Sequence, residues 1–545
     1  MVATTFSTDT PNLVTDIVRR DGVAGNWVWW SFLLTGMLTV FVYARLWKRS
    51  GVLTDIEFYE LRYSGKPAAF LRGFRAVYLG FFFNVVIMAS VSLAAVKIGG
   101  VLLGLSPIQT ILIAGTVTVI YSSLGGLRGV LITDLIQFAM AMVGGVSAAV
   151  VALRLPEVGG LSGLLSHENV ADKLDLIPDF SDPTHAMAVF IIPLAVQWWS
   201  VWYPGSEPGG GGYVAQRMLA AKDEDNALGA VLLFQVAHYA LRPWPWILVA
   251  LASLIVFPDL EAIQQAFPDI DRGILRHDLA YPAMLTFLPA GLMGLVLASL
   301  AAAYMSTMSS QLNWGSSYLV NDFYQRFVRP DAPERELVLV GRVSTILLML
   351  IASTLALYLE SAMQAFNILL TIGAGTGLLF LLRWFWWRIN AFSEIVAMVV
   401  SFIVALYFEF GTNVAWTSHQ KLLMGIALTT AAWLVTTFVA PRTDNATLET
   451  FYRLIKPSGP GWQRVRDQLA DATEPLPISP PEDNIPQALM NIFLGCVGTY
   501  SALFTIGLFL YGQLPMAILL GAIAVVAFFL LFRSRYRRLT HKITA

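Results

Sequence analysis

Thirteen mostly apolar stretches, bounded by charged or turn-forming residues, follow one another along the 545-residue chain. A helix needs roughly 20 apolar residues to cross the hydrocarbon core of a bilayer. Charged residues make up 13% of the chain, against about 25% in soluble domains. The sequence therefore predicts an all-α polytopic membrane protein and excludes a soluble enzyme, a nucleic-acid-binding protein and a disordered hub. After a shorter piece at 1–18, the stretches lie at 27–46, 74–103, 107–124, 130–154, 185–203, 228–257, 282–320, 338–359, 364–386, 391–410, 422–440, 488–512 and 514–533.

The composition also limits the partners and the chemistry. The chain carries 35 basic and 36 acidic residues, a balance that argues against nucleic acid or another polyanion as partner. Its one cysteine, Cys496, excludes a disulfide framework or a thiolate metal site. No nucleotide-binding loop, zinc-ligand cluster or nucleophile motif is visible. We therefore expect neither an enzyme nor a cofactor, and the bilayer as the surrounding medium.

The basic residues alternate between loops in a way that predicts orientation. When loops are assigned to alternate sides, 26 lysines and arginines fall in one set and seven in the other. Loops rich in these residues stay in the cytoplasm. This places the C-terminal cluster from Arg533 to Lys542 in the cytoplasm, and Met1 there too. We expect a multi-pass protein of the cell membrane, the inner membrane of a bacterium.

Two halves of five spans each resemble one another in layout. The third member of each half, 68–103 and 282–322, is unusually long. The first member of each half is interrupted, by Asp9-Thr10-Pro11 and by the run from Pro204 to Gly212. Halves of opposite orientation that start with broken helices are typical of secondary transporters with a site near the midplane. An ordinary loop at 204–212 and a frayed N-terminus explain the same residues.

This symmetry divides the chain into a 5+5 inverted-repeat core and about four extra C-terminal spans. The predicted parts are a first repeat with a truncated first helix (1–154), an extracellular loop (155–184), a second repeat (185–390), additional spans (391–440), a cytoplasmic linker (441–487), and two last spans with a basic tail (488–545).

Polar residues inside the apolar stretches are the candidates for function, because each is costly in a membrane. Asp9, Lys97, Glu207 and Arg242 are ionisable, although Lys97 is also placed to reach the membrane surface and Arg242 to support a proline bend. Adjacent hydroxyls in the run Ala301–Ser310 suit a hard cation such as sodium, or serve only close helix packing. The aromatic run Trp198, Trp199, Trp202 and Tyr203 fits a substrate pocket or an interfacial belt equally well.

Four separated motifs stand out: Gly125–Gln137, Thr54–Phe58 with Leu61–Tyr63, Ala215–Lys222, and Ala303–Ser310 followed by Asn321–Tyr324. They resemble motifs of the solute:sodium symporter family, whose members adopt the leucine-transporter-like inverted-repeat fold. They occur in the family's order between residue 1 and about residue 390. The closest resembles the family's fifth-helix signature.

The resemblance implies where sodium and solute bind. It implies a sodium site made by the carbonyls of Ala3, Phe6 and Ala303 and the hydroxyls of Ser306 and Thr307. The family's fifth-helix acidic residue corresponds to Asp134, which is implicated in the inward exit of the cation. By position, solute contacts are expected from Thr5, Asp9, Thr10, Lys97, Trp199, Trp202, Tyr203, Glu207, Gln364 and Asn367.

Two departures from the family pattern limit these assignments. Members usually carry a further N-terminal helix and the cytoplasmic half of the first core helix, so we expect a start codon assigned too late or a real truncation. The run Gly209–Gly212 and Glu207 differ from the usual aromatic and amide pattern of the broken sixth helix. This difference weakens a sugar assignment.

The sequence thus predicts a sodium-coupled symporter that imports a small organic solute by alternating access. Charged groups at both breaks favour an amino acid or another zwitterion, such as proline. A proton-coupled transporter in which Asp9 or Glu207 titrates, and a membrane sensor that binds solute without transport, are the alternatives. The partners are the solute, the sodium ion and the lipid bilayer; the oligomeric state is left open.

Overall fold

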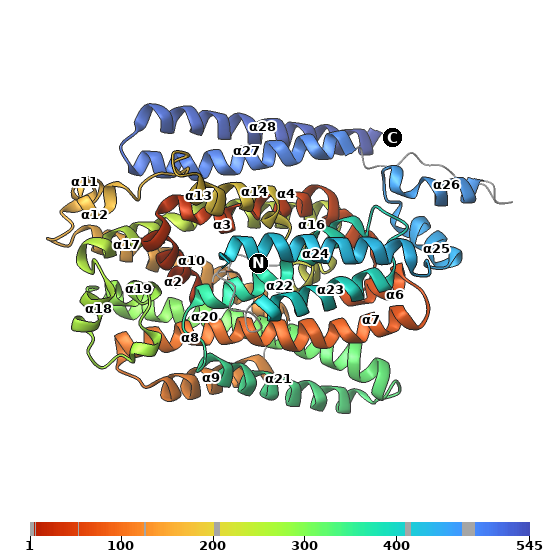
Figure 1. The fold of residues 1–545 in the computed structure, drawn as a ribbon, viewed down its shortest axis with the longest axis horizontal. Helices are drawn as coiled ribbons and strands as arrows, with labels where there is room; N and C mark the ends of the chain where they lie inside the picture. The colour runs from red at the N-terminus through yellow and green to blue at the C-terminus, as the bar shows by residue number, and fades with distance from the viewer. Residues whose placement is uncertain are drawn as a thin grey trace.

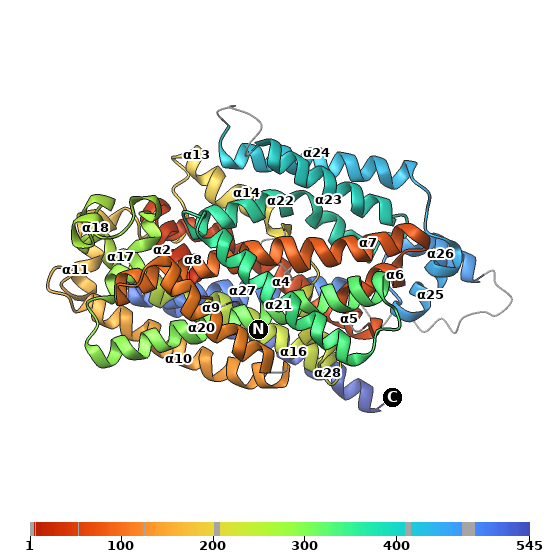
Figure 2. The same ribbon diagram turned by 90° about the horizontal axis from the view of Figure 1, so that it is seen from below.

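The structure, a computed structural model, describes residues 5, 7–52, 54–124, 127–200, 208–408, 416–470 and 485–544. All regular elements within these ranges are helices. Most run close to one common direction and form a bundle (Figures 1 and 2). Among the described residues, nine helices are long and apolar enough to cross a membrane. The fold is therefore that of an all-α polytopic membrane protein, as predicted.

The first half contains five helical rods with a short connection after the second. In chain order its elements are α2 (Asp9–Asp21); η1 (Val23–Asn26), α3 (Trp27–Trp30), α4 (Leu33–Leu38), η2 (Thr39–Tyr43) and α5 (Ala44–Ser50); η3 (Asp55–Glu57) and α6 (Phe58–Arg62); α7 (Gly65–Val77), η4 (Tyr78–Phe83) and α8 (Asn84–Leu103); α9 (Pro107–Leu124); and α10 (Leu127–Leu153).

The second half follows after two short helices, α11 (Gly160–Ser166) and α12 (Glu168–Ala171). Its elements are α13 (Pro183–Ala186), η5 (Met187–Ile191), α14 (Ile192–Ala195) and η6 (Gln197–Trp199); α15 (Gly212–Leu219); α16 (Glu224–Val236), η7 (Ala237–Leu241) and α17 (Pro243–Val256); α18 (Leu260–Ala266), η8 (Arg272–Ile274), η9 (His277–Leu279) and α19 (Ala280–Leu285); α20 (Ala290–Ser317) and η10 (Tyr318–Val328); α21 (Glu334–Ala356); and α22 (Ala362–Leu382).

The third rod of each half is unusually long, as the sequence predicts. The helices Gly65–Leu103 and Ala290–Val328 each contain 39 residues. The two rods pack against each other, and α20 also packs against α10. This pairing brings the small and hydroxyl-bearing residues of α20 into the centre of the bundle.

Two helix boundaries differ from the prediction. The apolar stretch 282–320 is two helices rather than one, because α19 ends at Leu285 and α20 begins only after Pro289. Proline fixes its own backbone angle and has no N–H to donate, so it favours the start of a new helix. The stretch 185–203 stops being an α-helix at Ala195, and Val196 has a non-helical backbone. The described part of the second break therefore begins earlier than the glycine run.

The C-terminal part packs onto the core. Helices α27 (Ile485–Leu510) and α28 (Leu514–Thr544) pair along one side of the bundle, and α23 (Ala391–Leu406) pairs with α24 (Ser418–Val439) (Figure 1). The segment predicted as a plain linker instead contains α25 (Asn445–Ile455), η12 (Pro460–Trp462) and α26 (Gln463–Ala470). Phe451 and Trp462 are fully buried and lie under the guanidinium of Arg62.

Candidate functional site

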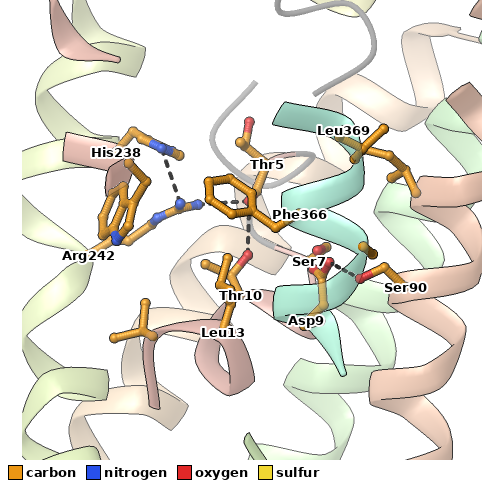
Figure 3. Close-up of a pocket in the computed structure, with 15 residues that line it drawn as sticks. Thr5, Ser7, Asp9, Thr10, Leu13, Ser90, His238, Arg242, Phe366 and Leu369 are labelled. Carbon is orange, nitrogen blue, oxygen red and sulfur yellow. Dashed lines mark hydrogen bonds between the residues drawn. The ribbon is translucent and has the colours of Figure 1, made fainter. Parts of the chain in front are cut away.

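A small cavity of about 60 Å³ lies at the start of α2 (Figure 3). Its wall comes from both halves: the segment around the start of α2, α3 and α8 from the first, and η7, Arg242 and α22 from the second. The lining residues are Thr5, Ser7, Asp9, Thr10, Leu13, Val14, Trp29, Ile87, Ser90, His238, Arg242, Ala362, Ala365, Phe366 and Leu369.

The backbone at the start of α2 is held by side chains. Ser7 has no helical assignment, and α2 begins at Asp9. The carbonyl oxygen of Thr5 accepts a hydrogen bond from Nη1 of Arg242 at 2.9 Å and one from the hydroxyl of Thr10 at 3.4 Å. A backbone carbonyl in a membrane interior must find a donor. Arg242 supplies that donor from the opposite half of the protein.

Polar contacts continue around the cavity (Figure 3). The Ser90 hydroxyl donates to Oδ2 of Asp9 at 3.0 Å. Nη2 of Arg242 lies 3.2 Å from Nε2 of His238. A carboxylate and a guanidinium therefore line one small cavity, with apolar walls from Phe366 and its neighbours on α22.

The predicted solute contacts separate into three groups. Thr5, Asp9 and Thr10 line the cavity. Lys97, Gln364, Asn367 and Trp199 are not among the lining residues. Trp202, Tyr203 and Glu207 lie outside the described residues.

The second group has other surroundings. Nζ of Lys97 is paired with Asp278, and Oε1 of Gln364 accepts a hydrogen bond from the backbone of Glu360 at 3.0 Å. Asn367 is exposed on α22. The ring of Trp199 contacts Trp198, with centroids 5.3 Å apart. For Lys97, the membrane-buried charge was visible in the sequence, but its partner Asp278 was not.

The predicted sodium ligands on α20 are buried. Ala303, Ser306 and Thr307 have 2%, 2% and 0% of their surface exposed. Ala3 and Phe6, the other two expected ligands, lie outside the described residues. The helix that carries Asp134, α10, packs against α20, whereas the side chain of Asp134 belongs to the part that is not described.

A second cavity is lined by residues of this part of α20 and by Thr8, just before the start of α2. It has a volume of about 420 Å³ and is lined by Thr8 together with residues of α8, α9 and α20, among them Ala301 and Tyr304. Tyr304 Oη lies 3.3 Å from the Ser92 hydroxyl on α8. Thr8 and the turn of α20 that precedes Ser306 therefore line the same cavity.

Sequence reasoning missed several cavity residues. His238 lies one helical turn before Arg242 in the same apolar stretch, and ionisable residues inside spans are functional candidates. That signal was available for His238. Trp29, Ser90 and Phe366 resemble many other apolar or small residues of the spans, and only the packing of the two halves selects them.

At one end of the bundle, buried charges join the two halves. Nζ of Lys97 on α8 lies 2.6 and 2.8 Å from the two carboxylate oxygens of Asp278 and donates to the Glu360 carbonyl at 2.7 Å. Lys97 and Asp278 are each 1% exposed. Glu360 lies two residues before the start of α22, the helix that supplies the apolar wall of the cavity.

A neutral histidine stands beside this pair. Burial, and then the charges of Arg19, Arg20 and Lys173, lower the pKa of His277 to about 4. His277 therefore remains uncharged at neutral pH, and its Nδ1 accepts a hydrogen bond from Arg19 at 3.3 Å.

At the opposite end, a second network also joins the halves. Arg72 on α7 pairs with Asp322 of η10 at 2.7 Å and with Glu60 of α6 at 2.7 Å. Burial by itself would raise the pKa of the Glu60 carboxyl. Hydrogen bonds from Arg326 and Arg72 outweigh that effect, so the pKa is lowered. The Thr54 hydroxyl also donates to Asp322, at 3.2 Å.

The glycine run in the second break is held by the same end of the first half. Oδ2 of Asp55 accepts a hydrogen bond from the Gly212 amide at 2.6 Å, at the start of α15. Nε1 of Trp47 donates to the Gly209 carbonyl at 2.8 Å. Gly209 has φ +88°, and a Cβ there would lie 2.9 Å from the Tyr43 ring. Glycine is therefore required by both the backbone angle and the close approach.

The model of the sodium:solute symporter family matches residues 15–401. The chain is 27% identical to a sodium/glucose cotransporter of Vibrio parahaemolyticus over 402 residues, which cover 70% of this chain and 71% of that protein. It is 30% identical to sodium/myo-inositol cotransporter 2 of Rattus norvegicus over 325 residues, which cover 54% of this chain and 46% of the relative.

A solved structure shares the fold. The substrate-bound, outward-open Na⁺-coupled sialic acid symporter superposes with a TM-score of 0.58 at 20% identity, covering 81% of this chain and 89% of the other. The fold is therefore the 5+5 inverted-repeat transporter core with additional C-terminal helices. Because the family model spans most of the chain, this protein belongs to the sodium:solute symporter family.

Proposed function

We propose that this protein imports a small organic solute together with sodium, and that the solute binds in the cavity at the start of α2. One observation carries the proposal. Asp9 of the first half and Arg242 of the second line the same cavity, beside a backbone carbonyl that is held by side chains. A site at the interface of the two halves is accessible to opposite sides when the halves move relative to each other.

The sodium ion is proposed to bind between α20 and the segment before α2. Oxygen ligands suit this hard cation as they suit calcium. Buried hydroxyls of Ser306 and Thr307 and the carbonyl of Ala303 provide three of them, and the carbonyls of Ala3 and Phe6 are the proposed remainder. Asp134 on α10 is the proposed acceptor on the inward exit path.

One coupled sodium ion is sufficient for strong accumulation. A charge that moves through 100 mV releases about 2.3 kcal/mol, and a tenfold concentration ratio adds about 1.4 kcal/mol. Together these terms sustain a roughly 500-fold accumulation of a neutral solute. A second ion is therefore not required by the energetics.

The class of solute follows from the charges in the cavity. The carboxylate of Asp9 and the guanidinium of Arg242 suit a solute with one positive and one negative group, such as proline. A sugar or polyol is the second candidate, because the relatives are named for glucose and myo-inositol. The cavity of about 60 Å³ must widen for either, since ligand pockets commonly occupy about 300–1,000 Å³.

A binding screen separates these classes. The purified protein would be heated with proline, glucose, myo-inositol or sialic acid, in sodium or in potassium buffer. We expect a rise in the unfolding temperature with proline in sodium only. A rise with glucose or myo-inositol instead would reassign the solute to the second class. A shift that is equal in both buffers and follows a pH change would favour proton coupling.

The sodium ligands are tested by removing one hydroxyl at a time. Ser306→Ala and Thr307→Ala should each raise the sodium concentration for half-maximal uptake, by roughly tenfold for one lost ligand. Ser316→Ala is the matched control, because its hydroxyl is also on α20 but bonds the carbonyl of Asn313 in the same helix. An unchanged sodium dependence in both ligand variants would show that the hydroxyl assignment is wrong.

A further inference from the structure

Three arginines from separate segments meet at the end of α24. Arg388 lies between α22 and α23, and its Nη2 donates to the carbonyl oxygens of Phe438 at 2.9 Å and Ala440 at 3.2 Å. Arg442 follows the last residue of α24, Val439, by three positions. Arg464 on α26 lies over the ring of Trp387, with its guanidinium carbon 4.8 Å from the ring centroid.

Arg442 and Arg464 lie close enough to Arg388 for their charges to act on it. Burial, and then the charges of Arg442 and Arg464, lower the pKa of Arg388. Among the described residues, no carboxylate forms an ion pair with any of the three. Nη1 of Arg388 is buried without a hydrogen-bond partner in the described part of the chain. The cluster therefore has donors and charge to offer an anion.

The cluster lies where the apolar surface of a helix ends. Helix α24 is a candidate membrane span over Ser418–Val439. Its last residues, Phe438 and Val439, are 63% and 81% exposed. Apolar side chains that are so exposed at the end of a span face lipid chains, and the arginines just beyond them lie at the depth of lipid headgroups. The loop-charge pattern predicts that this end is cytoplasmic.

We propose that Arg388, Arg442 and Arg464 bind the phosphate headgroup of an anionic phospholipid, whose acyl chains lie against Phe438 and Val439. Guanidinium groups match phosphate oxygens in pairs, and each arginine supplies several donors in a fixed plane. Basic pockets at the cytoplasmic ends of membrane helices recognise anionic headgroups in this way. Exposed apolar residues beside the cluster favour a lipid over a soluble phosphate. The lipid joins the connection before α23, the end of α24 and α26.

The test compares lipids that differ only in the headgroup. The purified full chain in neutral detergent would be titrated with phosphatidylglycerol or phosphatidylcholine of identical chains, and binding followed by native mass spectrometry and thermal stability. We expect at least tenfold tighter binding of phosphatidylglycerol. The variant Arg442→Gln/Arg464→Gln should lose most of this preference while its elution from size exclusion stays unchanged.

The control removes the same number of charges elsewhere. Arg335→Gln/Arg342→Gln changes two exposed arginines of α21 and should keep the preference for phosphatidylglycerol. Arg442→Lys/Arg464→Lys, which keeps the charge, checks folding and should retain part of it. An equal preference in the Arg442→Gln/Arg464→Gln variant and the wild type would overturn the proposal. So would competition by inorganic phosphate as effective as that by the lipid, because the site would then bind free anions.

Discussion

Arg242 connects the two halves at a single backbone atom. Its guanidinium donates to the Thr5 carbonyl, contacts His238 and lies 5.3 Å from the centroid of the Trp246 ring. The sequence marks it as a charge inside an apolar stretch but leaves open whether it serves the cavity or the bend at Pro243. The structure places Arg242 in the cavity wall as well as at the start of α17.

Replacing Arg242 should impair solute and sodium binding together. Arg242→Gln loses the charged hydrogen bond to the Thr5 carbonyl, at a cost of about 2 kcal/mol, or roughly 30-fold in apparent affinity. Arg242→Lys keeps one charged donor and should recover part of the loss. Sodium and solute titrations of uptake measure both effects. Kinetics that are unchanged in Arg242→Gln would refute a positioning role for this side chain.

For single residues, prediction from the sequence succeeds where the residue is energetically costly in its surroundings. Asp9, Lys97 and Arg242 stood out because a membrane span seldom contains charge. Their partners did not, since Asp278 lies far along the chain in a loop where acidic residues are common. Asp9 lies in the cavity wall and Lys97 in an ion pair, and this difference depends on packing between distant segments.

Helices were predictable from the sequence where nearby residues alone determine their length and their ends. Apolar length gave the helices, and proline and glycine gave the breaks, but the helix end at Ala195 was missed because no helix breaker follows it directly. The two helices within 441–470 were also missed. Their apolar residues are few, and Leu448, Phe451 and Ile455 are buried only because the core provides a surface for them.

The glycine run offers a test at the scale of one element. Gly209→Ala puts a side chain at φ +88° and 2.9 Å from the Tyr43 ring, and the backbone angle alone costs about 1–2 kcal/mol. We expect a lower unfolding temperature and reduced uptake. Gly291→Ala on α20 is the control, because a Cβ there meets nothing within 4 Å. If both variants behave alike, the close approach of Gly209 to Tyr43 has no role in stability.

Ion pairs connect the two halves of the molecule at both of its ends. Lys97 and Asp278 close one end, and Arg72, Asp322 and Glu60 close the other. The cavity lies between them, so we infer that each ion-pair network opposes opening at its own end. Buried pairs of this kind are best removed as pairs, because a lone buried charge destabilises the fold by itself.

Removing the ion pair at one end or at the other should change the accessibility of the cavity in opposite directions. The reporter is Phe366→Cys, which lines the cavity, in a background where Cys496, the one native cysteine, is replaced by alanine. Lys97→Met/Asp278→Asn should speed labelling by an external impermeant maleimide about fivefold, for a change of about 1 kcal/mol. Arg72→Gln/Asp322→Asn should slow it. Arg272→Gln, an exposed change near the first pair, is the control; equal rates in all variants would contradict the inference.

The family and the fold were predictable from the four sequence motifs, because these motifs occur along the chain in the order that is typical of sodium:solute symporters. The packing of the halves was not, because Thr5 and Arg242 lie far apart in the sequence and meet only in three dimensions. The central claim is that sodium drives the solute through this cavity. It is tested most directly by proteoliposomes with an inward sodium gradient and an inside-negative potential. We predict accumulation of the solute that stabilises the protein, and its loss when potassium replaces sodium or a sodium ionophore is added. Accumulation that is equal in potassium, or driven by a pH gradient alone, would contradict it.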